Sequence, residues 1–223
     1  MKNSLFFAIC LFFGMLQAQV STVTIGSQSW MNYNLNAPKY NDGTPIPKIT
    51  SAAEWAGLTT GAYCYYNFDS TNYAAKFGKL YNWYAVAGIW DEASKTDVSK
   101  RKKLGPTGFH VATKKDWDTL INTLGGLGDA GGRLKGTVTD QWDTPNNGAS
   151  NSSKFTAKGG GYMGKSGNFY YNLRYGYWWT ATSEYEVDRM ANAYSNYLYS
   201  GSGSIYKSTS DKKMGLSVRC VKD

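Results

Sequence analysis

Apolar and polar residues alternate or recur in short blocks along this chain, and the blocks predict short elements rather than long ones. Over residues 20–31, Val23 and Ile25 alternate with threonines ahead of a Gly-Ser pair, which predicts a two-residue β-hairpin. Residues 36–48 hold three of the five prolines and are expected to form a loop. Residues 61–68 are strand-like.

Three further segments have the spacing of short helices. A helix is expected to start at Ser51, which has a glutamate at capping-box distance, and to end at Gly57. Residues 79–87 place apolar side chains at i, i+3, i+4 and i+7, the spacing of one helix face. The clearest helix is 113–124, where Thr113 can cap the first turn and an apolar stripe runs along one side.

Aromatic strands replace helices in the second half of the chain. Glycine-rich turns separate four predicted strands at 170–181, 191–199, 204–207 and 215–221. Helical segments followed by strands, without β-α-β alternation, predict an α+β domain. The sequence contains no internal repeat or low-complexity linker, so we expect one domain over residues 19–223.

The first eighteen residues have the composition of an export signal. Lys2 supplies a positive charge, apolar or small residues fill positions 5–16, and Ala18 suits cleavage. The apolar stretch is too short to span a bilayer, which needs roughly 20 such residues. We therefore expect residues 1–18 to be a signal peptide and the domain to be secreted or at the cell surface, with the periplasm as an alternative. No transmembrane anchor is expected.

Composition narrows the class of protein. The chain has 223 residues, a formal net charge of +8 and 42% hydrophobic residues, which is enough for a packed core. A single histidine, His110, excludes a zinc site that needs two imidazoles. The sequence also lacks a G-x-S-x-G nucleophile motif. We expect a structural or surface role for His110, no cofactor and no enzyme activity.

Removal of the signal would leave two cysteines, Cys64 and Cys220. Two thiols in an exported chain favour one disulfide, and its large loop would stabilise the fold by about 4–5 kcal/mol in the chain-entropy model. Two buried free thiols are the alternative. A reactive pair is disfavoured because no basic residue adjoins Cys64 to lower its pKa.

Aromatic residues are the richest candidates for function. The chain has eight Trp and eighteen Tyr against nine Phe, and rings with a polar group suit wet surfaces and interfaces. Adjacent Trp178 and Trp179 point to opposite faces of a strand, so we expect one in the core and the other on the opposite face. The candidate ligand-binding residues are Tyr175, Tyr177, Trp179, Tyr197 and Tyr199, with Trp142 and Asn147 added from the long loop. The alternative is that these rings only cover a sheet.

Two other features carry weaker hypotheses. The basic run 100–103 suits an anionic polymer, but acidic residues lie just upstream and no aromatic is interleaved, so a solvated loop is favoured. Nucleic acid is not expected as a partner of an exported chain. The loop 143–148 resembles a calcium loop, but Pro145 stands where an oxygen ligand is needed. No metal site is therefore expected.

Several segments together resemble the Fibrobacter succinogenes major paralogous domain, a family of exported bacterial domains. They are TVTIGSQSWMNYNLN at 22–36, YCYYN at 63–67, GKLYNWYAV at 78–86, LGPTGFHVATKKDWDTL at 104–120, AGGRLKG at 130–136, GYWWTATSE at 176–184 and MGLSVRCVKD at 214–223. The resemblance implies a C-type lectin-like fold with paired terminal strands and a long loop region that carries binding surfaces. Both family cysteines are matched, which favours a Cys64–Cys220 disulfide.

These observations together predict an exported, non-enzymatic module that binds a glycan or a cell-surface protein by aromatic stacking. Calcium is not expected to take part, because the E-P-N, Q-P-D and W-N-D motifs of calcium-dependent lectins are absent from the sequence. A structural or tip subunit of a cell-surface assembly is one alternative. An oxidase of the formylglycine-generating type is another, but both cysteines lie in strand-like stretches that resemble structural positions.

Overall fold

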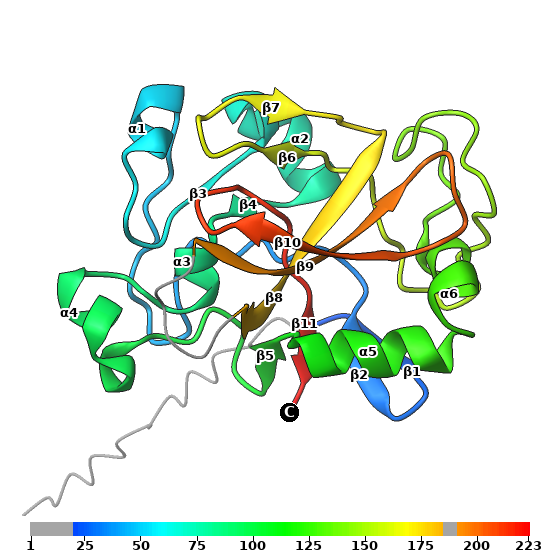
Figure 1. Ribbon diagram of the computed structural model, residues 1–223, viewed down its shortest axis with the longest axis horizontal. Helices are drawn as coiled ribbons and strands as arrows, with labels where there is room; N and C mark the ends of the chain where they lie inside the picture. Colours follow the sequence, from blue (N-terminus) through cyan, green and yellow to red (C-terminus); the bar gives the residue numbers. More distant parts are fainter. Residues whose placement is uncertain (1–19, 185–190) are drawn as a thin grey trace, which may run out of the picture.

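The computed structural model describes residues 20–184 and 191–223, in which short helices surround small antiparallel sheets (Figure 1). The predicted signal peptide lies outside the described residues. The helices are α1 (Ala52–Ala56), α2 (Ser70–Phe77), α3 (Trp83–Val86), α4 (Glu92–Thr96), α5 (Lys114–Thr123) and α6 (Leu127–Leu134), with 3-10 turns η1 (Tyr66–Phe68) and η2 (Val98–Lys100). The fold is α+β, as the sequence predicts.

The strands form four sheets. In chain order they are β1 (Thr22–Ile25), β2 (Gln28–Met31), β3 (Tyr63–Cys64), β4 (Leu80–Tyr81), β5 (Phe109–Val111), β6 (Tyr162–Met163), β7 (Phe169–Tyr170), β8 (Tyr175–Ser183), β9 (Asn192–Tyr199), β10 (Tyr206–Asp211) and β11 (Cys220–Lys222). The sheets have the orders β1-β2-β11-β5, β10-β9-β8, β3-β4 and β6-β7. Every helix in the described ranges is too short or too polar to cross a membrane.

The four-stranded sheet joins segments from both ends of the chain. Its first two strands form the predicted hairpin, which turns at Gly26 with a φ of 59° that glycine adopts without strain. β11 then pairs with β2, where Val221 lies opposite Trp30, and with β5 on its other side. The terminal strands are therefore paired, as the family resemblance implies.

Side-chain caps place two helices where the sequence predicts them. The Ser51 hydroxyl accepts a hydrogen bond from the Glu54 amide, and α1 ends at Gly57. Thr113 and Asp116 form a reciprocal capping box at the start of α5, whose apolar stripe is buried. Each cap satisfies main-chain donors that a helix end leaves without a partner, which is why local sequence fixes these boundaries.

Several predicted elements are wrong in extent. In the second half of the chain, the strand expected over 170–181 is β8 from Tyr175 onward, and that expected over 215–221 is the short β11. Two elements of the first half also differ. The strand expected over 61–68 contains only the two residues of β3, and Asn67 then adopts a left-handed conformation (φ 53°) in η1. The helix expected over 79–87 begins as β4 and becomes helical only after Asn82. The Asn82 side chain accepts a hydrogen bond from the Ala85 amide and so starts α3 late.

Trp178 and Trp179 point to opposite faces of β8, and both are fully buried. Trp178 packs in a cluster with the apolar stripe of α5, whereas Trp179 packs in a second cluster with Trp83 of α3. The prediction that one of the two tryptophans would lie outside the core is therefore wrong. A core covers both faces of β8 at this point.

Arg219 is fully buried although the alternation of residues 215–221 places it on the polar face of a strand. Its guanidinium lies 4.2 Å from the centre of the Phe155 ring and is covered by the main chain around it. It donates hydrogen bonds of 2.8–3.0 Å to the Asn34 side chain and to the carbonyls of Met31, Phe155 and Thr156. Asn34 accepts a further bond from Trp178 Nε1, 2.9 Å away.

The predicted Cys64–Cys220 disulfide is absent from the structure, in which both cysteines are free thiols. Cys64 is buried in a cluster with Trp55, whereas Cys220 is buried in a separate cluster with Trp179. Each thiol packs among the apolar side chains of its own cluster. Burial raises the pKa of both thiols, that of Cys220 to about 12, so burial disfavours the thiolate on which cysteine reactivity depends.

His110 lies between two carboxylates beside the β5–β11 pair. Its Nδ1 is 2.8 Å from Asp223 Oδ1, and its Nε2 is 3.2 Å from Asp116 Oδ2. Burial lowers the pKa of His110, but the hydrogen bonds with Asp223 and Asp116 outweigh burial and raise the pKa above its usual value. Both ring nitrogens are occupied, which is the arrangement of a structural histidine.

This raised pKa predicts that mild acid stabilises the fold. The charged ring contributes fully below the unfolded pKa of about 6.5, and the contribution is lost as the pH rises through the higher folded pKa. Because the imidazole is 40% exposed, we expect less than ~1 kcal/mol. Urea unfolding at about pH 5.5 and about pH 8.5 should show a smaller difference for His110→Gln than for the wild type. An identical difference in both proteins would contradict the assignment.

Candidate functional site

A row of neighbouring tyrosine rings, some stacked and others tilted or edge-on, covers one face of the β10-β9-β8 sheet and continues onto the β6-β7 hairpin. Neighbouring ring centres are 4.8 to 6.2 Å apart. We call this row the tyrosine surface, and its members are Tyr162, Tyr170, Tyr171, Tyr175, Tyr177, Tyr197, Tyr199 and Tyr206. These sheets lie side by side in Figure 1, with β6 and β7 beside the start of β8.

Strand register explains the row. Tyr177 lies opposite Tyr197, and Tyr197 lies opposite Tyr206, so three strands each place one ring at the same level. Tyr175 lies opposite Tyr199 at the next level of the same face. Because successive side chains alternate between faces, the residues between these tyrosines point into the core under α5.

The geometry of the rings suits contact with flat, partly polar molecules. Tyr197 and Tyr206 are nearly parallel, with an interplanar angle of 10°, and Tyr177 and Tyr197 are inclined by 28°. Most of these rings are half-buried, so each is fixed in place by its neighbours and still reaches solvent. Burial, together with nearby tyrosines, raises the pKa of Tyr177 and Tyr197, so both hydroxyls stay protonated and can donate hydrogen bonds.

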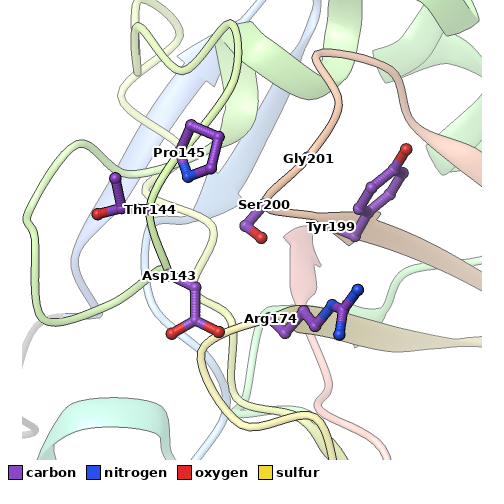
Figure 2. A pocket seen from close by; sticks show the side chains of 7 residues that line it. All are labelled: Asp143, Thr144, Pro145, Arg174, Tyr199, Ser200 and Gly201. Carbon is purple, nitrogen blue, oxygen red and sulfur yellow. The ribbon is translucent and has the colours of Figure 1, made fainter.

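A pocket of about 400 Å³ adjoins the tyrosine surface. Figure 2 shows the loop residues of the pocket on one side and Arg174 and Tyr199 on the other, with Ser200 between them. The residues lining the pocket are Asp143, Thr144, Pro145, Arg174, Tyr199, Ser200 and Gly201. Asp143 and Arg174 are exposed, and neither side chain has an ion-pair partner among the residues described.

Main-chain hydrogen bonds hold the two sides of the pocket together. The Asp143 amide donates to the Leu173 carbonyl at 2.8 Å, and the Asn147 amide donates to the Ser200 carbonyl at 2.7 Å. The Ser200 amide in turn donates to the Arg174 carbonyl at 2.9 Å. These bonds link the loop, the start of β8 and the end of β9. The main chain of the fold therefore fixes the walls of the pocket.

Lys135 supports the pocket from inside the protein. Its side chain is fully buried, and Nζ donates to the carbonyls of Asn147 and Ser202 at 2.8 Å and of Tyr199 at 3.2 Å. Three acceptors match the three protons of an ammonium group. Burial lowers the pKa of Lys135 to about 8.

Helix α6, which the sequence analysis does not predict, delivers Lys135 to this position. Glycine lowers helix propensity, yet two of the three glycines of α6, Gly131 and Gly132, let loops pass close to the helix. A Cβ on Gly132 would lie 2.2 Å from the Gly148 carbonyl oxygen, and a Cβ on Gly131 would lie 2.2 Å from the Ser204 carbonyl oxygen. Packing against the loops therefore outweighs the low propensity of this segment.

Four of the predicted ligand-binding residues lie together on the tyrosine surface. They are Tyr175, Tyr177, Tyr197 and Tyr199. Alternation within each strand predicts that Tyr175 and Tyr177 share a face, as do Tyr197 and Tyr199, and the register of β8 with β9 puts both pairs on the same face. Arg174 and Asp143 are not among the residues predicted from the sequence, although Arg174 directly precedes Tyr175 and Asp143 follows an aromatic residue in the same loop.

Two other predicted ligand-binding residues belong to the core. Trp179 is fully buried beneath α3, and its Nε1 donates to the Tyr81 carbonyl at 2.8 Å. Trp142 is only 2% exposed, and its Nε1 donates to the Ala157 carbonyl at 2.8 Å. Their selection as ligand contacts is therefore corrected, because segments distant in the sequence cover both rings.

Asn147 is exposed, and its side chain helps to hold the loop of the pocket against the end of β9. The amide nitrogen donates to the Gly201 carbonyl at 3.0 Å, which adds a side-chain bond to the main-chain bond between this loop and the β9 end. Asn147 does not line the pocket itself. Its place in the site is that of a positioning residue.

The basic run 100–103, another candidate binding feature of the sequence, makes contacts within the protein. Arg101 donates to the carbonyls of Ser94 and Lys95, and Lys102 pairs with Asp42, so much of the basic run is engaged within the protein. Over residues 20–184 and 191–223, no three His, Cys, Asp or Glu side chains gather in a way that could hold a metal ion.

Comparisons with known proteins give one positive finding. A search of curated proteins returned no match, and neither did a search of solved structures. The family model described as the Fibrobacter succinogenes major domain matches residues 23–222. This range runs from the first hairpin to the last strand of the structure. The chain therefore belongs to the Fibrobacter succinogenes major domain family.

Proposed function

We propose that the domain is an exported, non-enzymatic carbohydrate-binding module whose tyrosine surface stacks against sugar rings without calcium. The observation that carries this proposal is the continuous row of tyrosine rings, most of them half-buried and fixed by their neighbours, beside a preformed pocket. The export-type composition of residues 1–18 supports a place outside the cytoplasm, where free and surface-attached glycans are found.

The chemistry of tyrosine matches that of a sugar ring. A pyranose has an apolar face made of C–H groups and a rim of hydroxyls, so its partner must offer flat apolar area and hydrogen bonds together. Tyr177, Tyr197 and Tyr206 offer both from adjacent strands. The row contains no charged side chain, so a neutral sugar ring can displace water from it without burying an unpaired charge.

Replacement of Tyr197 by alanine should weaken glycan binding about 5- to 10-fold, because the stacking contribution of one ring is lost. Tyr197 is the central ring, stacked on Tyr177 at 5.0 Å and on Tyr206 at 4.8 Å. A glycan array on residues 19–223 would identify a ligand, and calorimetry would give its affinity for both proteins.

Tyr194→Ala provides the matched control for this experiment. Tyr194 is on the same strand, but its ring lies near the Lys114 ammonium of α5, away from the tyrosine surface. The affinity of this variant should equal that of the wild type. The proposal fails if no glycan binds, or if Tyr197→Ala binds as tightly as Tyr194→Ala.

A protein partner is the other outcome of the same experiment. Tyrosine is enriched and charge is depleted at the centres of protein interfaces, and the tyrosine surface has this composition. If the array is blank and light scattering shows a stoichiometric complex that Tyr197→Ala disrupts, the domain is a subunit of a surface assembly instead.

A further inference from the structure

We infer that the pocket beside Tyr199 selects the ligand, taking one uncharged sugar residue between Asp143 and Arg174. This inference rests on the proposed function and adds the chemical class of the ligand. The tyrosine surface by itself stacks against any flat ring. Discrimination between sugars therefore needs directional polar groups, and in the described structure these groups adjoin the surface at this pocket.

The size of the pocket fits a single ring. Its volume of about 400 Å³ is near the lower end of the range for ligand sites, roughly 300–1,000 Å³. Its walls are held by main-chain hydrogen bonds and, from behind, by the Lys135 ammonium. A ligand would therefore meet a preformed shape, with little ordering of the loops on binding.

Tyr199 makes the pocket and the tyrosine surface one site. Its ring lines the pocket and also stacks on Tyr175 at 5.4 Å and near Tyr206 at 5.8 Å. A sugar chain with one residue in the pocket can continue over these rings. The pocket then supplies specificity, and the surface supplies contact area.

The two charged side chains of the pocket favour a neutral ligand. The Asp143 carboxylate only accepts hydrogen bonds, and the Arg174 guanidinium only donates them. Sugar hydroxyls donate and accept, so one neutral ring can satisfy both groups. A uronate carboxylate drawn to Arg174 would still face the Asp143 carboxylate across the pocket, and an amino-sugar ammonium drawn to Asp143 would still face the Arg174 guanidinium. Each charged class therefore meets one repulsive group, which is how a site rejects a close analogue.

Two conservative variants test this selection in opposite directions. The probes are maltohexaose and mannohexaose as neutral chains, a galacturonate hexamer and a glucosamine hexamer. The wild type should prefer a neutral chain. Asp143→Asn should improve binding of the galacturonate hexamer relative to the neutral chain about 10-fold, because repulsion is removed and Arg174 remains. Arg174→Gln should improve the relative binding of the glucosamine hexamer by a similar factor.

Asp129→Asn and Arg133→Gln are matched controls, since both residues are exposed on α6 outside the pocket. Neither control should change the order of preference. If Tyr197→Ala weakens glycan binding while the pocket variants keep the wild-type preference, the inference is overturned and the proposed function stands. A wild type that binds none of the probes, or that prefers a charged hexamer, also overturns the inference, and only an additional blank glycan array would remove the proposed function.

Discussion

Replacing Arg219 with alanine should destabilise the domain by about 3–5 kcal/mol, out of the roughly 5–15 kcal/mol typical of a folded domain. The guanidinium is fully buried and contacts three main-chain carbonyls and the Asn34 side chain. Removing it takes this donor away from the carbonyls of Met31, Phe155 and Thr156, and it leaves Asn34 Oδ1 with Trp178 Nε1 alone. It also leaves a cavity over the Phe155 ring.

Urea unfolding followed by tryptophan fluorescence would measure this loss. Arg133→Ala, on the exposed face of α6, is the matched control and should change stability by no more than about 0.5 kcal/mol. Arg219→Lys should recover only part of the loss, because an ammonium keeps the charge but not the planar fork of donors. A cost below about 1 kcal/mol for Arg219→Ala would contradict a stabilising role for the buried hydrogen bonds of the guanidinium.

Replacing Lys135 with methionine should destabilise the domain by about 2–4 kcal/mol and loosen the pocket. Methionine preserves most of the apolar stem, so the change removes the donor with little loss of packing. The carbonyls of Asn147, Tyr199 and Ser202 then lose a charged donor. Because these carbonyls belong to the loop and to the β9 end, the two sides of the pocket lose a shared anchor.

Hydrogen exchange distinguishes this local effect from general destabilisation. Amides of Asn147 and Ser200, which bridge or flank the pocket, should exchange faster in Lys135→Met, whereas those of the β1–β2 hairpin should follow global stability alone. Lys115→Met on the exposed side of α5 is the control and should leave both unchanged. Protection at Asn147 that equals the wild type would contradict the anchoring role of Lys135.

The family match and the structure support different parts of the expectation drawn from resemblance. Membership in the family is shown by the match over residues 23–222. The α+β class and the pairing of β2 with β11 are present in the structure. The C-type lectin-like assignment stays a prediction, since the search of solved structures returned no match.

Elements with a local signal were predictable. Ser51 and Thr113 cap their helices through bonds to residues three positions away, and Gly26 supplies the turn of the first hairpin. Helix α6 has no such signal, because its glycines are favoured by contacts with the Gly148 and Ser204 loops and not by their neighbours in sequence. Local propensity cannot report a contact that forms across the fold.

For the site, the sequence alone determined that Tyr175 shares a face with Tyr177 and that Tyr197 shares a face with Tyr199, since alternation within a strand fixes which side chains share a face. Only the tertiary structure decided what covers each face. It buried Trp179 and Trp142, placed Cys64 and Cys220 in separate clusters, and enclosed the polar side chain of Arg219. It also brought Asp143 to Arg174 through main-chain bonds between distant segments. Periodicity is a property of neighbouring residues, whereas burial and pocket formation depend on segments that meet only when the whole chain folds.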